Sequence, residues 1–536
     1  MMFGTTLNQK TVLNDFLSIG ASLSSEKDIQ QLLENIIQTA MRFTNADAGS
    51  IYLVQENQTL HYEIVHTKSR DLHWGGTSGT PIDASPIPLF LLDGEPDLTR
   101  VACYAFHRAE TVNIADVYNA TGFDFSGTHK LDVRNGYRSQ SFLTIPMKNH
   151  ESEVIGILQL INAVDPFAGN IIPFSAANQS LAEALASQAA VALTNRNLIN
   201  HLEKLFESFI SLINHAIDDK SPYTGGHCNR VPDLTMMLAD AVNRSKVGPL
   251  STFSLTEEDR HELKIAGLLH DCGKITTPVH VVDKATKLEM IFDRIHLIET
   301  RAEIIYRDIQ LLETSGKIST ESALQKREQL IDDCNFLCHS NIGVESMRDQ
   351  DIARVYEIAE RYRWEDISGK RHDFLDADEI VNLTIRAGTL TPAERQIINH
   401  HIDSTISMLE KLPWPKHLKN VPEYAGGHHE RMDGRGYPKG LKRHEMSVQA
   451  RCMGIADIFE ALTAQDRPYK KGKTLSESLN ILGKMKLNGH VDPDLFDIFI
   501  WEKVYAEYAE KFLEEHLIDE IDLNAIPGYI PPPTGR

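Results

Sequence analysis

The spacing of apolar residues changes more than once along the chain, and each change predicts a different kind of element. Between residues 29 and 40 apolar positions recur every three or four residues, which is typical of an amphipathic helix. Shorter apolar runs then predict β-strands at residues 50–54, 60–65, 141–145 and 154–161. A helix beside an antiparallel sheet, with a long loop-rich segment between the second and third strands, predicts an α+β domain.

This domain is expected to span residues 25–179, after an N-terminal helix or extension over residues 1–24. From residue 180 to about 218 the pattern is that of one long helix. Apolar residues alternate four- and three-residue steps along it, as in a coiled-coil seam, at Leu198, Leu202, Leu205, Phe209, Leu212 and Ala216. We therefore expect residues 180–220 to pair with a second copy as a signalling helix. The alternative is an amphipathic helix that packs on its own domain.

Beyond residue 222 the pattern is almost entirely helical, with long charged helical runs from about 287 to 363. Thr391-Pro392-Ala393-Glu394 is a strong helix start, because Thr can cap the helix, Pro suits its first position and Glu suits its third. Residues 521–536, which are Pro/Gly-rich from Pro527 onward, are expected to be a flexible tail. Two domains joined by a helix also suit a chain of 536 residues, which is too long for one core.

Composition narrows the classes of partner. The formal net charge of -21 argues against sequence-independent binding to duplex nucleic acid, although a small anionic ligand is compatible with local cations or bound metals. No apolar run approaches the roughly 18–20 residues of a membrane span, and the first 25 residues lack a signal-peptide pattern. The six cysteines are few and scattered, as expected of free thiols in a reducing compartment. We therefore expect a cytoplasmic protein.

Three polar clusters carry the candidate chemistry. One is His270-Asp271, followed by Lys274; another is the stretch 426–438, with adjacent histidines in a glycine-rich setting; the third centres on Asp457, an acid among small and apolar residues. A buried acid needs a partner, and His with Asp suits borderline transition metals. Two metals about 3.5–4 Å apart can stabilise both the attacking and the leaving oxygen in phosphoryl transfer. The clusters therefore predict a metal centre.

The N-terminal domain resembles a GAF domain. The residues that carry this resemblance are Asn45–Ser50, Asn113–Asp116, Ser141–Pro146 and Gly156–Asn162. The resemblance implies a sensory module that binds a small molecule, or a spacer between two subunits. The ligand is not identified by these residues, and a module with no ligand is the alternative.

Residues 221 to about 473 resemble an HD-GYP domain, the bacterial branch of the HD phosphohydrolases. The matching motifs are Tyr223-Thr-Gly-Gly-His227, Leu268-Leu-His-Asp-Cys-Gly-Lys274, His428-His-Glu430 with Asp433-Gly434 and Gly436-Tyr-Pro438, and Ala456-Asp457 with Asp466-Arg-Pro-Tyr469. The resemblance implies an all-α domain over 221–520 with a helical insertion at about 285–388. The basic family lacks this insertion.

The resemblance also implies the metal ligands. His227, His270, Asp271 and Asp457 match the set for one ion, and Asp271 would bridge to a second ion held by His428, His429 and a mid-domain histidine. Both His296 and His401 fit the family pattern for that histidine. We choose His401, because it follows the strong helix start and lies at the family's distance from His428. Two divalent ions are expected, iron or manganese first, with zinc or nickel as alternatives; a third is not favoured, because no glutamate shortly precedes His227.

Other roles follow from the same resemblance. Asp271 and Lys274 are the predicted catalytic residues, and Lys274 is also expected to contact the scissile phosphate. Arg467 and Lys470 resemble a phosphate-binding pair, although the spacing before them is one residue longer than usual. Tyr437 is expected beside the substrate. Glu430 and Asp433 are expected to orient the N–H groups of the histidines.

The activity that the resemblance implies is metal-assisted hydrolysis of cyclic di-GMP to pGpG, which the family can carry on to GMP. The GAF domain would regulate this activity through the long helix. The expected partners are cyclic di-GMP, a second copy of the chain, and diguanylate cyclases or other signalling proteins. The alternatives are a phosphodiesterase for another cyclic nucleotide or dinucleotide, and a cyclic di-GMP receptor or scaffold with little turnover.

Overall fold

The structure is a computed structural model that describes residues 26, 28–221, 226–343, 346–465 and 472–532. Two compact units divide the chain, one ending at Phe206 and one beginning at Glu207, and each is described by itself. The predicted N-terminal extension lies outside the described residues, as do Arg467 and Lys470. Among the described helices, none is both long enough and apolar enough to cross a membrane.

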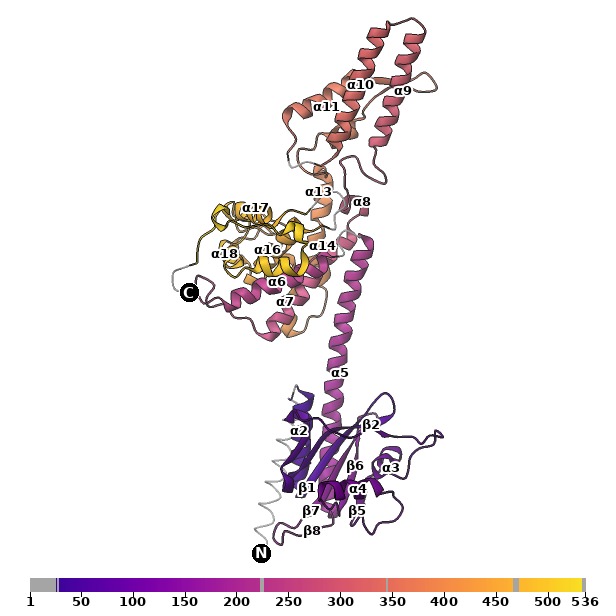
Figure 1. Ribbon diagram of the computed structural model, residues 1–536, viewed down its shortest axis with the longest axis vertical. Coiled ribbons are helices and arrows are strands. Elements are labelled where there is room, and N and C mark those ends of the chain that lie inside the picture. Colours follow the sequence, from indigo (N-terminus) through magenta and orange to yellow (C-terminus); the bar gives the residue numbers. More distant parts are fainter. Residues whose placement is uncertain (1–25, 27, 222–225, 344–345, 466–471, 533–536) are drawn as a thin grey trace. The chain divides into compact units, whose positions relative to one another are not determined.

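The first unit is built on an antiparallel sheet with the strand order β3-β2-β1-β7-β6-β5 (Figure 1). Two short strands pair at its sides, β4 with β2 and β8 with β7. The four predicted strands are confirmed as β1, β2, β6 and β7, whereas β3, β4 and β5 fall in the segment predicted to be loop-rich. The strands are β1 (Ala46–Val54), β2 (Thr59–Thr67), β3 (Leu72–Gly75), β4 (Ile87–Pro88), β5 (Val112–Ile114), β6 (Phe142–Lys148), β7 (Val154–Val164) and β8 (Ile171–Ile172).

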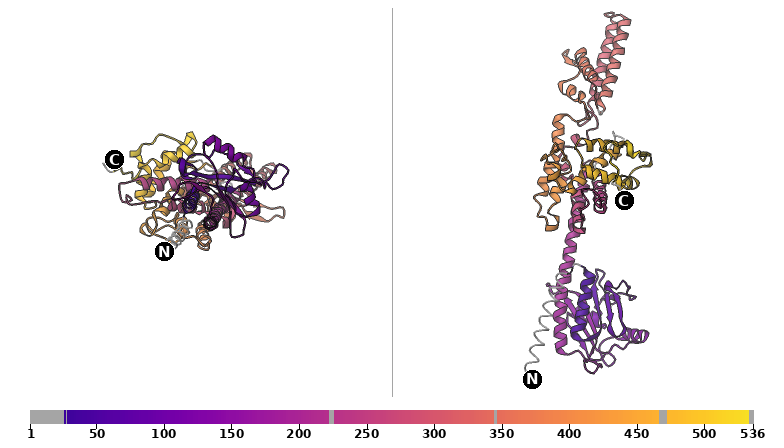
Figure 2. Two further views of the ribbon diagram at one scale, coloured as in Figure 1. Left: turned by 90° about the horizontal axis from the view of Figure 1, so that it is seen from below. Right: turned by 90° about the vertical axis from the view of Figure 1, so that its left-hand side faces the viewer.

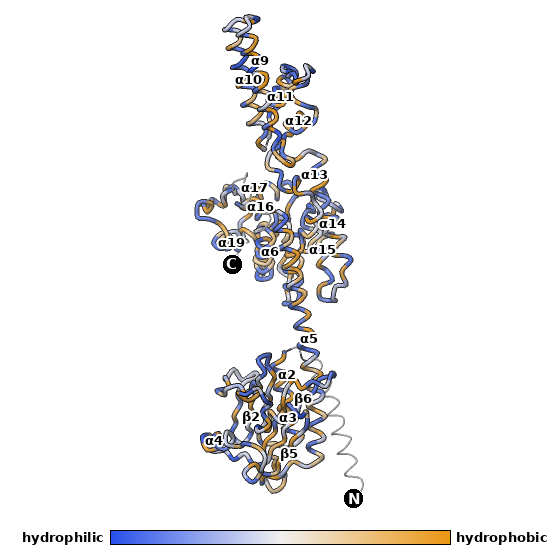
Figure 3. The backbone as a smooth tube through the Cα atoms, turned by 90° about the vertical axis from the view of Figure 1, so that its right-hand side faces the viewer, coloured by the Kyte–Doolittle hydropathy of each residue, from blue (hydrophilic) through white to orange (hydrophobic). Residues whose placement is uncertain are grey.

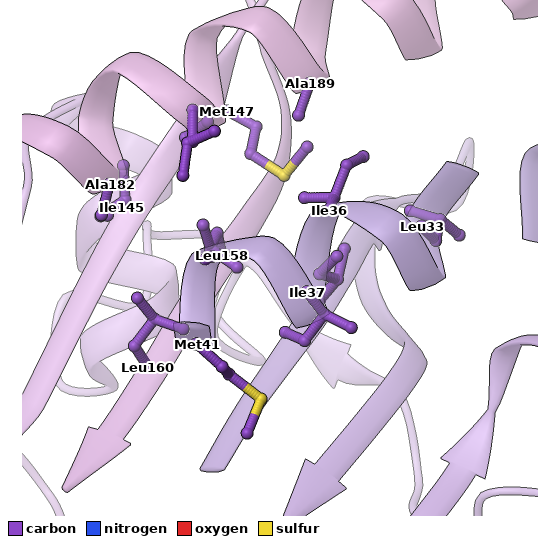
Figure 4. Close-up of a cluster of buried hydrophobic side chains, with 14 of the residues drawn as sticks. Leu33, Ile36, Ile37, Met41, Ile145, Met147, Leu158, Leu160, Ala182 and Ala189 are labelled. Carbon is purple, nitrogen blue, oxygen red and sulfur yellow. The ribbon is translucent and has the colours of Figure 1, made fainter. Parts of the chain in front are cut away.

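Alternation along the strands gives this sheet two apolar faces. Ile51 and Leu158 pack with α2 (Ile29–Thr44) and with the start of α5 (Ala176–Lys220). Figure 4 shows side chains of both helices, such as Ile37 and Ala189, gathered with Leu158. The neighbouring residues Tyr52 and Ile157 face the other side, where α3 (Val101–Arg108) packs. The first unit is therefore a helix–sheet–helix sandwich, as expected of the α+β class.

The single helix expected over residues 180–218 is present as α5, which begins in the first unit and ends in the second. Its first turns are buried against the sheet as far as Leu193. Further on, apolar residues recur along the tube (Figure 3), and the predicted seam is roughly half exposed or more at Leu198, Leu202, Leu205, Phe209 and Leu212. This exposure does not fit the alternative in which the seam packs on its own domain.

The second unit is mainly helical. Thr391 caps α13, because its side chain accepts from the backbone N–H of Glu394 while the Glu394 carboxylate accepts from Thr391 N, which confirms the predicted helix start. The elements around the histidine motifs are α6 (His227–Arg244), α7 (Glu257–Leu269), the 3-10 turn η3 (Cys272–Thr276), α8 (Val279–Val282), α13 (Pro392–Asn399), α14 (His401–Leu409), α15 (Val421–Gly426), α16 (Val448–Thr463), α17 (Leu475–Leu487), α18 (Pro493–Trp501) and α19 (Val504–Phe512).

Residues of the predicted insertion form a lobe with its own apolar core, from Leu288 to Leu383. Figures 1 and 2 show it extending away from α6 and α16. A short hairpin corrects the expectation of helices alone: its turn is closed by Asp366, whose carboxylate accepts from the N–H groups of Ser368 and Lys370. The elements are α9 (Ile295–Thr314), α10 (Thr320–Asn341), α11 (Asp349–Arg361), β9 (Arg363–Glu365), β10 (Arg371–Asp373) and α12 (Ala377–Leu383).

The described part of the predicted tail, residues 521–532, packs on the helices of the second unit, which corrects the expectation of a flexible segment. Ile526 is buried, Trp501 donates its indole N–H to the Ile530 carbonyl, and Lys486 donates to the carbonyl of Gly528. One buried apolar side chain and two hydrogen bonds thus hold a segment that composition alone suggests is loose.

Candidate metal centre

All seven predicted metal ligands lie among the described residues, and the fold brings them together. His227 opens α6, His270-Asp271 follow directly on α7, and Asp457 lies in the middle of α16. His401 opens α14, and the adjacent pair His428-His429 comes just after α15. Residues that are far apart in sequence therefore meet, with Asp457 inside a helix and the others at or next to helix ends.

Asp271 lies between two groups of histidine nitrogens. Its Oδ2 is 3.2 Å from the Nε2 atoms of both His227 and His270, and its Oδ1 is 3.2 Å from Nε2 of His401. His227, His270 and Asp271 form one group whose ligand atoms lie within 4.8 Å of one another, and His401, His428 and His429 form another. The Asp457 carboxylate faces both groups, with Oδ1 3.2 Å from His227 Nε2 and Oδ2 4.0 Å from His429 Nδ1.

Three of these histidines are oriented by the backbone at the helix end where each one lies. Nδ1 of His270 donates to the carbonyl of Gly267 at 2.7 Å, that of His401 to Ile398 at 2.5 Å, and that of His428 to Ala425 at 2.6 Å. The last carbonyls of a helix lack helical partners and are free to accept. A ring that donates through Nδ1 carries its lone pair on Nε2, so all three direct a ligand atom into the site.

Glu460 orients His227 in a different way. Its Oε2 accepts from Nδ1 of His227 at 2.5 Å, and its Oε1 accepts from the guanidinium of Arg230 at 2.8 Å. The side chain is fully buried, one helical turn after Asp457 on α16. Sequence analysis did not assign this residue. The available signal was an acid three positions after Asp457, on the same face of an apolar helix.

The predicted role of Glu430 and Asp433 is wrong. Instead of meeting histidine N–H groups, Glu430 accepts from the backbone N–H of Lys439 and of Leu441. Asp433 accepts from the backbone N–H of Arg435 and pairs with the side chain of Arg431. Both carboxylates therefore shape the glycine-rich loop around Tyr437, because that loop has backbone donors that no sheet or helix satisfies.

We expect Glu460→Gln to lower metal affinity and activity by about 10–100-fold, the usual effect of losing a residue that orients a metal-binding histidine. The amide keeps the size of the side chain but removes the charge that fixes the His227 tautomer. Metal content and turnover of the purified variant measure the effect. The matched control is Glu477→Gln, an exposed glutamate in the first turn of α17. Equal metal content and turnover in both variants would contradict this role.

The donor set fits divalent metal ions. Asp271 Oδ1, His401 Nε2 and His428 Nε2 are buried and have no hydrogen-bond partner in the described part of the chain, although such atoms are normally paired. Burial and neighbouring histidines hold the pKa of His428 well below its usual value, and burial lowers that of His429 to about 4. Neutral imidazoles beside carboxylates are the ligands that borderline divalent metals prefer.

The carboxylates of the site are held ionised. Burial opposes charge on Asp271, but Lys274 and His270 outweigh it and keep its pKa well below the usual value. Burial also opposes charge on Asp457, where the contact with His227 keeps the pKa low. For His227 burial favours the neutral ring, yet the three surrounding carboxylates raise its pKa well above normal. The centre therefore attracts positive charge.

The other predicted site residues lie at the edge of this cluster. Lys274 Nζ is 2.5 Å from Asp271 Oδ2, and the Tyr437 ring stacks on His429 with centroids 4.9 Å apart. His296, the alternative to His401, is 71% exposed on α9 and pairs with Glu299. Of the two candidates, the structure brings only His401 to Asp271. The predicted phosphate-binding pair lies outside the described residues.

Known families match both units. The GAF domain family matches residues 28–193, and two HD domain families match residues 224–335 and 377–495. The two HD matches leave 336–376 uncovered, which falls inside the lobe. They include each of the seven clustered residues between them.

Relatives match over part of their length. A 3′3′-cGAMP-specific phosphodiesterase of Vibrio cholerae is 44% identical over 15% of this chain and 18% of its own. A cyclic di-GMP phosphodiesterase of Pseudomonas aeruginosa is 33% identical over 28% of this chain and 35% of its own. The chain thus spans little more than a third of these relatives at most.

Among solved structures, the GAF domain of an Acinetobacter phosphoenolpyruvate-protein phosphotransferase aligns with 18% identity and a TM-score of 0.26, over 35% of this chain and 96% of that one. A score of that size adds nothing to the assignment, which rests on the family matches and on the strand order. The chain therefore combines an N-terminal GAF domain with a C-terminal HD domain.

Proposed function

We propose that the protein is a metal-dependent phosphodiesterase of the HD-GYP type, which hydrolyses cyclic di-GMP to pGpG and then to GMP. The observation that carries this proposal is the position of Asp271, whose two oxygens face two separate groups of histidine nitrogens. A carboxylate placed in this way suits a bridge between two ions. The phosphodiesterase relatives in Vibrio and Pseudomonas support the reaction class.

In this proposal one ion is held by His227, His270, Asp271 and Asp457, and the other by Asp271, His401, His428 and His429. Bound there, two divalent ions supply the charge that stabilises the phosphate and its attacking and leaving oxygens. Iron or manganese is the first expectation for both positions, with zinc or nickel as alternatives.

The chain's own groups would bind and orient the substrate. Lys274 pairs with Asp271, and its partly exposed side chain can turn to a phosphate oxygen. The ring of Tyr437, held beside His429, offers a face on which a guanine base can stack. Arg467 and Lys470 remain proposed phosphate ligands. Because the chain carries a net negative charge, a substrate with two phosphates can bind only where cationic side chains offset the repulsion locally.

The test is to load the purified protein with Mn²⁺ or Fe²⁺ and to follow cyclic di-GMP and 3′3′-cGAMP by chromatography. We expect pGpG from cyclic di-GMP with the higher kcat/KM. If only 3′3′-cGAMP is hydrolysed, the proposed substrate is wrong but the reaction class stands. This alternative is tested because the Vibrio relative is named a 3′3′-cGAMP-specific phosphodiesterase. If neither nucleotide gives a product while metal is shown to be bound, the result contradicts the proposed enzymatic activity and favours a cyclic di-GMP receptor.

The proposal includes a homodimer formed through the exposed seam of α5. Five apolar side chains at coiled-coil spacing are more stably buried against a second copy than left in water. Light scattering should give about twice the 60.3 kDa mass of the chain. Leu202→Glu should lower that mass to one chain, whereas Leu324→Glu, at an exposed leucine of α10, should not. A monomeric wild type at micromolar concentration would contradict the seam.

A further inference from the structure

A second cluster of metal-ligating side chains lies in the GAF domain, remote in sequence from the HD motifs. It comprises Glu34 on α2, His66 on β2 and His73 on β3. His66 and His73 are direct cross-strand partners, and their rings meet edge to face with centroids 3.9 Å apart. The ligand atoms of the three side chains all lie within 4.8 Å of one another. Strand pairing therefore fixes two imidazoles side by side, under a carboxylate from the helix.

The Glu34 carboxylate is buried, so its negative charge needs nearby partners to offset the loss of water. The residue is 3% exposed, one position from the core residue Leu33. Its Oε1 accepts from the Gln38 amide at 2.7 Å, and its Oε2 lies 2.8 Å from His73 Nε2. A buried carboxylate is costly unless it is paired or coordinates a metal. One hydrogen-bonded histidine and one amide account for only part of its coordination.

His66 supplies the unexplained group. Its Nε2 is 3.0 Å from Glu34 Oε1, but the two atoms are not aligned as a hydrogen bond, and this nitrogen is buried without a hydrogen-bond partner among the described residues. The two Nε2 atoms thus lie beside the two oxygens of one carboxylate, and among the described residues hydrogen bonding satisfies only one of the two nitrogens. Such an orphaned nitrogen calls for a ligand that hydrogen bonding within the chain does not provide.

The backbone beside the carboxylate is kept free of side chains by Gly76. A Cβ at this position would lie 2.8 Å from Glu34 Oε2 and 2.8 Å from the Ile64 side chain. The residue directly follows β3 and has a φ of +55°, so both its backbone conformation and its surroundings favour glycine. The loop can therefore approach Glu34 closely without filling the space at its oxygens.

We infer that Glu34, His66 and His73 bind one divalent first-row transition metal ion in the GAF domain. Two imidazoles and a carboxylate are a common donor set for zinc and for non-haem Fe(II). With metal–ligand bonds of about 2.0–2.2 Å, tetrahedral ligand atoms lie roughly 3.4 Å apart. The observed separations are 3.0 Å from Glu34 Oε1 to His66 Nε2 and 2.8 Å from Glu34 Oε2 to His73 Nε2. The side chains therefore need to move by about half an ångström to take an ion between them.

Three protein ligands leave at least one coordination position open. The His73 side chain is 33% exposed, so one edge of the cluster lies near solvent. The ion would also tie α2 to the β2–β3 edge of the sheet. Because α2 shares its core with α5, occupancy of this site acts on the element that leads to the second unit.

The test uses the full chain, stripped with a chelator, dialysed against Zn²⁺ and analysed for bound zinc by mass spectrometry. The HD centre also takes up zinc in this experiment, so the readout is the difference between variants. We expect His66→Gln and His73→Gln each to bind one ion per chain fewer than the wild type. His61→Gln is the matched control, because His61 lies on the same strand β2, is 49% exposed and is outside the cluster. It should bind as much zinc as the wild type.

The decisive variant is His73→Gln, because its side chain is the most exposed of the three and its replacement disturbs packing least. Circular dichroism establishes that each variant is folded. Glu34→Gln is the second variant, since it keeps the size of the side chain while removing the charge. Unchanged zinc content in folded His73→Gln or Glu34→Gln, or loss of an ion from the His61→Gln control, would overturn the site.

Discussion

Replacement of Asp271 by asparagine is expected to lower turnover of cyclic di-GMP by more than about a hundredfold, because residues that merely orient a metal ligand already cost about 10–100-fold. Asparagine keeps the shape of the side chain and removes its charge. The carboxylate faces His227, His270 and His401 at 3.2 Å and pairs with Lys274, so one substitution disturbs both groups of nitrogens. Metal content and kcat, measured on the same preparation, report the loss.

The matched control for this variant is Asp403→Asn. Asp403 lies in the first turn of α14, two residues after His401, but its exposed carboxylate pairs with His400 on the outside of the helix. We expect this control to retain wild-type turnover. Wild-type turnover in Asp271→Asn would remove Asp271 from its bridging position, and with it the main support for a two-ion centre.

The residues of the HD centre were predictable mainly from the resemblance to the HD-GYP family, whose motifs imply the ligand set. His270-Asp271 and His428-His429 stand at helix ends, where a side chain can reach a shared centre. The choice of His401 over His296 rested on the helix start at Thr391 and on the family's distance to His428, and the structure places the two residues accordingly. The four main strands were predictable from their own pattern, since their alternation is long enough to distinguish from helix spacing.

Contacts between distant residues were not predictable. The Glu460 carboxylate meets His227 across 233 positions of sequence. The spacing from Asp457 places Glu460 on the same face of α16, but it does not identify His227 as the partner. Glu430 was expected to orient a histidine N–H group, whereas the folded loop offers it two backbone N–H groups instead. The inferred metal site in the GAF domain was not predicted from sequence for a similar reason. Glu34, His66 and His73 become neighbours only through strand pairing and helix packing.

Gly273→Ala is expected to cause the second large loss of activity, although Gly273 carries no functional group. A Cβ there would lie 2.0 Å from the carbonyl oxygen of His401 and 2.5 Å from the backbone N of Thr405. Both are backbone atoms of α14, so no rotation of a side chain relieves the clash. Either η3 or α14 must move, which separates Asp271 from His401. We expect a stability cost of about 1–3 kcal/mol, as for overpacked cores, and at least a tenfold fall in turnover.

Glycine is needed at position 273 because a side chain has no room there, and not because the backbone adopts a conformation that only glycine favours. Gly273 is not among the residues with positive φ, so alanine could adopt its backbone conformation if there were room. Thr405→Ala combined with Gly273→Ala should therefore give no recovery, because it trims a side chain and leaves the backbone clash in place. The matched control is Gly127→Ala in α4 (Ser126–Asn135), where a Cβ would meet nothing within 4 Å. The measurements are thermal unfolding and turnover of Gly273→Ala, of its combination with Thr405→Ala, and of Gly127→Ala. Wild-type values in Gly273→Ala would contradict the prediction, because they would show that η3 and α14 can move apart without loss of stability or activity.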